Sequence, residues 1–184
     1  TKLLPTLANY SQYYWRVSAK NAGGTSGYST SRTFRTVPAV PSTPTLVSPL
    51  DGAIDQSLTP TLTWNAVSGA TSYRLQVSTN SGFTAIVYND STITTTSKTL
   101  PNALSYSTTY YWRVSAKNAG GTSGYSSQWS FATRPNNPSI PNLLIPFNGS
   151  IDQSLTPTFT WSNVSGATSY RLQVSTNSGF TSLV

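Results

Sequence analysis

Few residues of this 184-residue chain have side chains suited to acid–base, nucleophilic or metal chemistry. The sequence contains no His, no Cys and no Glu, and its acidic residues are Asp51, Asp55, Asp90 and Asp152. These absences exclude a Ser-His-Asp or Cys-His arrangement and a His or thiolate metal site. We expect the four aspartates in turns and connections, where each carboxylate caps its own backbone. The sequence therefore predicts no catalytic, cofactor-binding or metal-binding residues, and a protein that is not an enzyme.

Basic residues are the second group whose side chains bind ligands. The chain has eleven Lys and Arg, a net charge of +7 and an isoelectric point of about 9.8. Arg74 alternates with apolar residues in the run Tyr73–Val77, and Arg113 does the same in the run Tyr110–Ala116. A period of two residues is typical of a strand with one buried face, so these cations are expected on the outward face of a sheet.

One internal period governs the whole chain. A shift of 97 residues aligns Trp15 with Trp112 and Trp64 with Trp161. The run from Tyr13 to Ser29 recurs unchanged at 110–126, and the run from Val67 to Thr84 recurs unchanged at 164–181. Such near identity indicates recent duplication in a repetitive gene and predicts tandem 97-residue repeats.

The only full repeat reads as strands throughout. Runs that alternate, such as Thr61–Trp64 and Tyr73–Ser78, are separated by turn signals such as Asp51-Gly52 and Asn118-Ala119-Gly120-Gly121. About seven short strands with no helical stretch predict an all-β fold, an antiparallel two-sheet sandwich. The residues expected to be buried in it are Trp64, Tyr73, Leu75, Val77, Trp112 and Val114.

These residues resemble the fibronectin type III family, in the form found in bacterial surface and secreted proteins. Trp64 matches the second strand, Tyr73–Val77 the third, and the run from Leu104 to Asn118 leads into the sixth. The resemblance covers the whole chain and implies a fibronectin type III-like, Ig-like sandwich. It also implies that the Tyr110 hydroxyl bonds to the backbone upstream. The loop after Ala116 reads NAGGTSGYS and not Arg-Gly-Asp, so nothing of integrin recognition transfers.

In the fold that this resemblance implies, the third and sixth strands are neighbours. Their outward residues then form a stripe, termed here the basic stripe, with counterparts in the flanking repeats: Arg74, Arg113, Lys117, Tyr111, Arg16, Lys20, Tyr14 and Arg171. Such a stripe would bind an anionic polysaccharide or another acidic surface. The alternative is a solvated sheet face whose long side chains cover aromatic residues. No recognised nucleic-acid-binding module is present.

The 97-residue period predicts three parts of the chain. Residues 1–37, the head segment, correspond to the last strands of a repeat. Residues 38–134, the middle domain, correspond to a complete repeat, and residues 135–184, the tail segment, to the first strands of the next. Neither segment is expected to fold alone, because each would leave one apolar face uncovered. The residues expected to become buried when two segments complete one another are Trp15, Val17, Phe34, Trp161, Tyr170, Leu172 and Val174.

Three interpretations of these segments stay open at this point. The chain is an excerpt of a longer repeat array, a proteolytic piece, or a subunit whose tail segment completes the head segment of the next copy. No apolar run approaches the roughly 20 residues needed to span a bilayer. We expect an extracellular or cell-surface structural or adhesive repeat protein whose partners are other copies of the same chain. The alternative is an accessory polysaccharide-binding or spacer module of a secreted carbohydrate-active enzyme.

Overall fold

The computed structural model describes all residues from Thr1 to Val184, which divide into two compact units, Thr1–Arg134 and Pro135–Val184. Every regular element is a strand, and the structure has no helix that could cross a membrane. The strands of the first unit are β1 (Gln12–Trp15), β2 (Lys20–Asn21), β3 (Gly24–Thr25), β4 (Arg32–Arg35), β5 (Leu46–Ser48), β6 (Ala53–Gln56), β7 (Thr61–Trp64), β8 (Ser72–Ser78), β9 (Ile86–Ile93), β10 (Ser97–Thr99), β11 (Thr109–Asn118), β12 (Gly121–Thr122) and β13 (Trp129–Thr133). The strands of the second unit are β14 (Leu143–Ile145) and β15 (Thr160–Trp161).

The smaller sheet of the middle domain has the strand order β10-β7-β5, with both pairs antiparallel. Along β7, Leu62 and Trp64 are buried while Thr61 is exposed, as the two-residue period of a strand requires. On the outer side, the hydroxyls of Thr61 and Thr99 are hydrogen-bonded at 2.7 Å across the two strands. The alternation of the sequence thus gives this sheet one apolar inner face.

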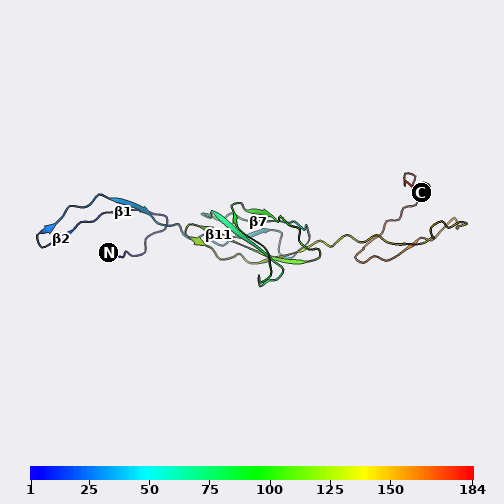
Figure 1. Cartoon of the computed structure of the whole chain (residues 1–184), viewed down its shortest axis with the longest axis horizontal. Helices are drawn as coiled ribbons and strands as arrows, with labels where there is room; N and C mark the ends of the chain where they lie inside the picture. The colour runs from blue at the N-terminus through cyan, green and yellow to red at the C-terminus, as the bar shows by residue number, and fades with distance from the viewer. The chain divides into compact units, whose positions relative to one another are not determined.

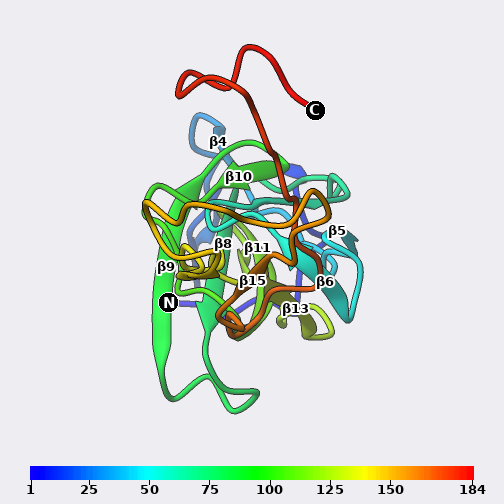
Figure 2. The ribbon, with the colours of Figure 1, turned by 90° about the vertical axis from the view of Figure 1, so that its right-hand side faces the viewer.

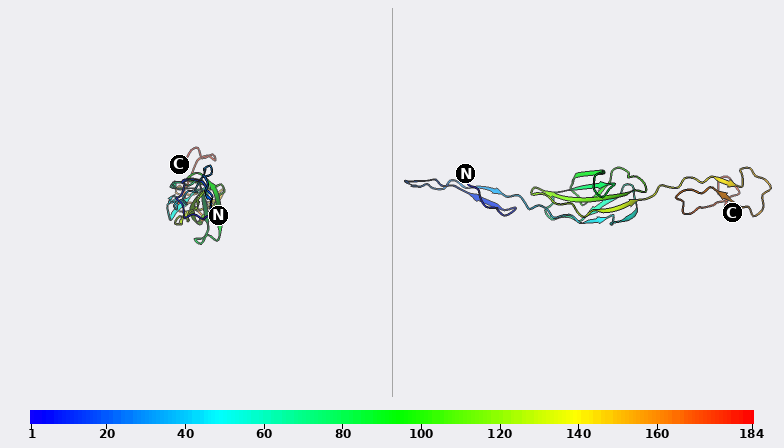
Figure 3. Two further views of the ribbon diagram at one scale, coloured as in Figure 1. Left: turned by 90° about the vertical axis from the view of Figure 1, so that its left-hand side faces the viewer. Right: turned by 90° about the horizontal axis from the view of Figure 1, so that it is seen from below.

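The larger sheet has the order β6-β13-β11-β8-β9, and β12 pairs with the end of β11. All its pairs are antiparallel except that of β6, which runs parallel to β13. β8 lies between β9 and β11 (Figure 2). The strands of the middle domain, coloured cyan to yellow-green, run along a common direction (Figure 3). In Figure 1 the label β7 marks the smaller sheet and the label β11 marks the larger one. The predicted antiparallel two-sheet sandwich is confirmed.

The core between the sheets contains all six residues whose burial the sequence predicts. Trp64 meets the ring of Tyr73 edge-on, with centroids 5.6 Å apart, and Tyr110 stacks on Phe131 at 5.8 Å. The indole N–H groups of Trp64 and Trp112 are buried without a hydrogen-bond partner. These two rings therefore stabilise the sandwich through buried apolar surface and aromatic contact.

A tyrosine corner holds the start of β11. The Tyr110 hydroxyl accepts a hydrogen bond from the backbone N–H of Ser105 at 3.1 Å, which confirms the bond implied by the resemblance. Thr133 supports the same corner, because its hydroxyl donates to the carbonyl of Ser105 at 2.7 Å. The backbone of the loop that leads into β11 is thus bonded to a side chain of β11 and to a side chain of β13.

The head segment forms the same corner without the rest of a sandwich. β1 pairs with β4 in the register Tyr13↔Phe34, which matches Tyr110↔Phe131 in the middle domain. The Tyr13 hydroxyl accepts a hydrogen bond from the N–H of Ala8 at 3.0 Å. The contacts that form this hairpin thus lie within the head segment.

The tail segment forms only some of the strands that its sequence forms in the middle domain. β14 pairs with β15, and the ring of Trp161 lies 5.5 Å from that of Tyr170. Residues 169–174, which correspond to most of β8, belong to no strand, and an isolated bridge joins Ser175 to Leu183. This part of the repeat does not form its strand when no neighbouring strand flanks it.

Candidate functional site

The basic stripe lies on the outer face of the larger sheet. In the β8–β11 ladder, Arg113 is paired with Gln76, Ser115 with Arg74 and Lys117 with Ser72. Because every second pair faces the same side, Arg74 is next to both Arg113 and Lys117 on that face. Tyr111, half-buried, extends the row at the position paired with Ser78.

Arg113 is held between two aromatic rings. Its guanidinium carbon lies 3.9 Å from the ring centre of Phe83 and 4.0 Å from that of Tyr125. Its Nε and Nη2 both donate to Oε1 of the buried Gln76, at 3.0 and 2.8 Å. Both flat faces of the guanidinium are therefore covered, and two of its donors are already used. This arrangement, termed the arginine sandwich, makes Arg113 a packing residue of the sheet.

Arg74 and Lys117 are the members of the stripe that face solvent. Both are exposed, and Nε of Arg74 donates to Oδ1 of Asn89 at 3.0 Å. A hollow of about 180 Å³ lies between them, lined also by Ser91 and Ser115. An anion at this face would thus meet two cations instead of the expected three.

The counterparts of the stripe in the flanking segments are placed differently. Arg16 lies 4.0 Å from the ring centre of Tyr28, which reproduces one half of the arginine sandwich. Tyr14, Lys20 and Arg171 are exposed. Phe180, which corresponds to Phe83, is also exposed.

The residues predicted for completion of a half-domain lie on uncovered surfaces. The exposed fractions are 50% for Trp15, 58% for Val17, 40% for Phe34, 40% for Tyr170 and 48% for Leu172. Trp161 and Val174 are half-buried.

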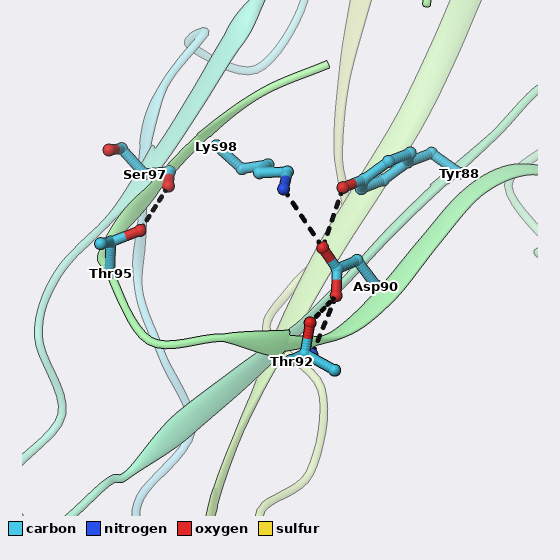
Figure 4. Close-up of polar contacts among 6 residues, drawn as sticks. All are labelled: Tyr88, Asp90, Thr92, Thr95, Ser97 and Lys98. Atoms are coloured by element: carbon cyan, nitrogen blue, oxygen red, sulfur yellow. Dashed lines mark hydrogen bonds and ion pairs between the residues drawn. The ribbon is translucent and has the colours of Figure 1, made fainter. Parts of the chain in front are cut away.

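Asp90 is the one carboxylate in an ion pair. It lies on β9 and accepts hydrogen bonds from the N–H and hydroxyl of Thr92, at 2.9 and 2.8 Å (Figure 4). Its Oδ2 accepts from the Tyr88 hydroxyl at 3.1 Å and lies 3.3 Å from Nζ of Lys98 on β10. The bond from the Thr92 N–H, followed by that from the hydroxyl, lowers the pKa of the Asp90 carboxyl to about 2, and burial raises the pKa of Tyr88. Asp90 thus links the larger sheet to the smaller one through Lys98 and stays ionised at neutral pH.

The expected position of the aspartates in turns and connections was wrong for Asp90 and Asp55, and the expected capping of its own backbone was wrong for Asp51. Asp90 and Asp55 lie within strands β9 and β6, not in turns. Asp51 lies in a turn but caps a distant strand, because its Oδ1 accepts from the N–H and hydroxyl of Ser130 at 2.7 and 3.1 Å. The parallel pairing of β6 with β13 brings this turn and Ser130 together, a contact that no local pattern contains. No group of three or more acidic, His or Cys side chains is arranged to hold a metal ion.

The order of the strands in the two layers decides the fold. The middle domain has a fibronectin type III-like fold. Its three-stranded and larger sheets face one another across the tryptophan core, and β8 and β11, the strands that carry Arg74 and Arg113, are neighbours in the larger sheet. The sandwich is a generic module of the fibronectin type III and Ig-like kind. Such a fold by itself does not indicate a function, which has to be argued from the residues on its surface.

Comparisons with known proteins give structural neighbours only. No family model matches the sequence, and no curated protein matches it significantly. The FN1–FN3 domains of chicken CNTN1 are similar at 21% identity and a TM-score of 0.46, over 70% of this chain and 44% of that one. An Fn3-like protein from Clostridium thermocellum is similar at 28% identity and a TM-score of 0.39, over 54% of this chain and 97% of that one. The chain spans less than half the length of the chicken chain that it matches.

The sequence did not indicate the partners of Arg113. Phe83 follows the turn signal Asn80-Ser81-Gly82, has a positive φ of 55°, and lies with its ring against the Arg113 guanidinium. One signal was available, because Phe83 and Tyr125 both lie in runs that recur unchanged as Phe180 and Tyr28.

Proposed function

We propose that the chain is a structural or adhesive repeat protein of the cell surface or extracellular space. Its sandwich domains act as units of length, and the head segment of one chain is completed by the tail segment of another. Repetition of this contact builds a head-to-tail homopolymer.

The observation that supports this proposal is a difference in burial between identical residues. Trp112 and Phe131 of the middle domain are 0% exposed, whereas their counterparts Trp15 and Phe34 are 50% and 40% exposed. Leu75 is likewise 0% exposed, whereas Leu172 is 48% exposed. Each segment thus presents apolar side chains that the same sequence buries when complementary strands are present. Burying one such side chain contributes about 1.5–3 kcal/mol.

The strands that each segment holds are complementary. The head segment has β1 and β4, which correspond to β11 and β13, and the tail segment has β14 and β15, which correspond to β5 and β7. The central ladder of the larger sheet, between β8 and β11, would re-form between residues 169–175 and residues 14–20, which begin in β1. Unpaired strand edges of this kind pair readily with another chain.

The geometry of such a contact favours a chain of subunits. Joining a tail segment to a head segment is a heterologous contact, which uses two different surfaces of the molecule. A heterologous contact propagates into a filament unless its rotation closes a ring. The expected product is therefore a series of sandwiches in which complete and completed domains alternate.

One observation favours the second candidate, a polysaccharide-binding accessory module. The hollow between Arg74 and Lys117 offers two exposed cations on a flat sheet face. The arginine sandwich argues against it, because the third cation of the stripe is already engaged. Binding of dextran sulfate to the chain, lost in a variant with both Arg74→Ala and Lys117→Ala, would favour this candidate.

The experiment that tests the main proposal follows the size of the 184-residue chain against concentration. Sedimentation velocity should show growing polymers for the unchanged chain and monomers for Val17→Asp or Val174→Asp. Val87→Asp is the matched control, because Val87 is exposed on β9 in the middle domain and should leave polymerisation unchanged. A folded monomer at all concentrations, with Trp15 and Trp161 both protected from quenching by acrylamide, would overturn the proposal.

A further inference from the structure

The middle domain binds the linker that precedes it, residues 38–40, at a surface site formed by Asn118, Gly120 and Gly121, which is termed the seat. The loop between β11 and β12 contains the buried Asn118, whose Nδ2 donates to the carbonyl of Ala39 at 2.8 Å and to that of Gly69 at 3.1 Å. Its Oδ1 accepts from the N–H of Gly120 at 2.8 Å, which closes the loop. One amide side chain thus ties together the linker and two loops of the domain.

Gly120 is required in this seat because the linker backbone touches it. A Cβ atom on Gly120 would lie 1.9 Å from the carbonyl oxygen of Pro38 and 2.9 Å from its carbon. The neighbouring Gly121 lies under Val40, whose Cγ2 would be 3.0 Å from an added Cβ. The contact between residues 38–40 and this loop therefore excludes side chains.

The head segment repeats the loop and the bond that closes it. Residues 19–26 have the same sequence as 116–123, and Oδ1 of Asn21 accepts from the N–H of Gly23 at 2.9 Å. A hollow of about 480 Å³ lies over Asn21, Gly23 and Gly24. An added Cβ on Gly23 would meet only Oδ1 of Asn21, at 3.3 Å. The loop is preformed, and its glycines are uncovered at the position that residues 38–40 take in the middle domain.

We propose that the seat formed by Asn21, Gly23 and Gly24 binds residues 135–137 of a second copy of the chain. This inference rests on the proposed completion of the head segment by a tail segment. By the 97-residue shift, residues 135–137 correspond to residues 38–40, the linker that fills the seat in the middle domain.

Both acceptors that the seat needs are present in the tail segment. Nδ2 of Asn21 donates to the carbonyls of Asn136 and Gly166, which correspond to those of Ala39 and Gly69. Gly166 has a φ of 78°, close to the 73° of Gly69, so its loop already has the required shape. Because the acceptors are backbone carbonyls, the replacement of Ala39 by Asn136 leaves the bonds unchanged. The seat fixes the linker that enters each completed domain and so sets the angle between successive units of the polymer.

Two single substitutions in the full 184-residue chain test the seat. Gly23→Ala adds a methyl group where the carbonyl of Pro135 would lie, without needing a positive φ. Asn21→Asp keeps the acceptor for the Gly23 N–H and replaces the Nδ2 donor by an oxygen that faces two carbonyls. Each change is expected to raise the concentration needed for polymerisation at least about tenfold, as overpacking or a buried unpaired oxygen does.

Gly27→Ala is the matched control. No atom lies within 4 Å of a Cβ on Gly27, and a Cβ on the corresponding Gly124 would lie 3.7 Å from Thr43 Oγ1, an ordinary contact. This variant should polymerise as the unchanged chain does. Sedimentation velocity at matched concentrations measures all four chains.

The results separate the seat from the completion on which it rests. If the unchanged chain polymerises and Gly23→Ala or Asn21→Asp does so at the same concentration, the seat is wrong and the completion stands. If the unchanged chain stays monomeric, the completion itself fails and the seat falls with it. If Gly27→Ala is as impaired as Gly23→Ala, the loss is not specific to the seat, and the proposal is overturned.

Discussion

Replacing Arg113 by Lys tests whether the arginine sandwich belongs to the fold or to a ligand site. The substitution keeps the positive charge and much of the stem. A lysine ammonium cannot present two flat faces to Phe83 and Tyr125 while donating twice to Gln76. The charge of the stripe is therefore unchanged, whereas the packing over β8 and β11 is lost.

The size of the effect follows from the contacts that Arg113 makes. Each contact between the guanidinium and a ring stabilises the fold by about 0.5–1 kcal/mol when it is exposed to solvent, and by more when it is desolvated. The hydrogen bonds to Gln76 come from a charged donor, and a buried amide oxygen left without its partner costs about 1–3 kcal/mol. Because lysine recovers part of these contacts, we expect the free energy of unfolding to fall by about 2 kcal/mol.

The assay is urea unfolding followed by tryptophan fluorescence, in a background carrying Val17→Asp so that association does not contribute. Arg74→Lys is the matched control, because Arg74 is exposed and makes one hydrogen bond, to Asn89. It should change the free energy of unfolding by no more than about 0.5 kcal/mol. An unchanged stability for Arg113→Lys together with weaker binding of dextran sulfate would refute the structural role and make Arg113 a ligand residue.

Three further changes in the middle domain test its packing and its charge cluster. Trp64→Ala should lower the free energy of unfolding by about 3–5 kcal/mol in urea, and a loss below about 1 kcal/mol would contradict the central position of this ring. Gly120→Ala should lower the melting temperature because its Cβ would overlap the backbone of Pro38, whereas Gly82→Ala, with only ordinary contacts, should leave it unchanged. The pKa of Asp90 is lowered from 3.8 to about 2, so its stabilisation is present above about pH 4 and is lost as the pH falls through about 2. At pH 7, Asp90→Asn should lower the free energy of unfolding by about 1 kcal/mol, a value that allows for solvent screening of this partly exposed group. This loss should be smaller at pH 2. A loss that is equal at pH 2 and pH 7 would argue against the shifted pKa.

The inner faces of the sandwich were predictable from the sequence because alternation is a local property. Leu75 and Val77 alternate with Arg74 and Gln76, and a strand sends successive side chains to opposite faces. The Tyr110 corner was predicted from the resemblance to the fibronectin type III family, and its hydroxyl reaches only five residues back along the chain. The division of the chain into head segment, middle domain and tail segment, and the ligands of the basic stripe, stay predictions.

The outer face depended on contacts between residues far apart in the sequence. Arg113 is thirty-seven residues from Gln76, and the turn that carries Phe83 reads in the sequence only as a polar loop. Asp51 bonds Ser130, seventy-nine residues away, because β6 and β13 run side by side. Such pairs are set by how the strands are ordered in the sheet, and a single run of letters does not contain that order.

The run VSGATSYRLQVSTNSGFT shows where the sequence stops and the tertiary structure takes over. By itself it determines the Tyr73 bond, because the Tyr73 hydroxyl accepts from the Val67 N–H at 2.9 Å and the second copy forms the same bond at 2.8 Å, between Tyr170 and Val164. It does not determine a strand, since 72–78 form β8 while 169–174 form none. The bond closes a loop of six residues, which local geometry suffices to hold. A strand needs backbone partners on another strand and a covered apolar face, and in the middle domain β9 and β11 supply the partners while the smaller sheet covers the face.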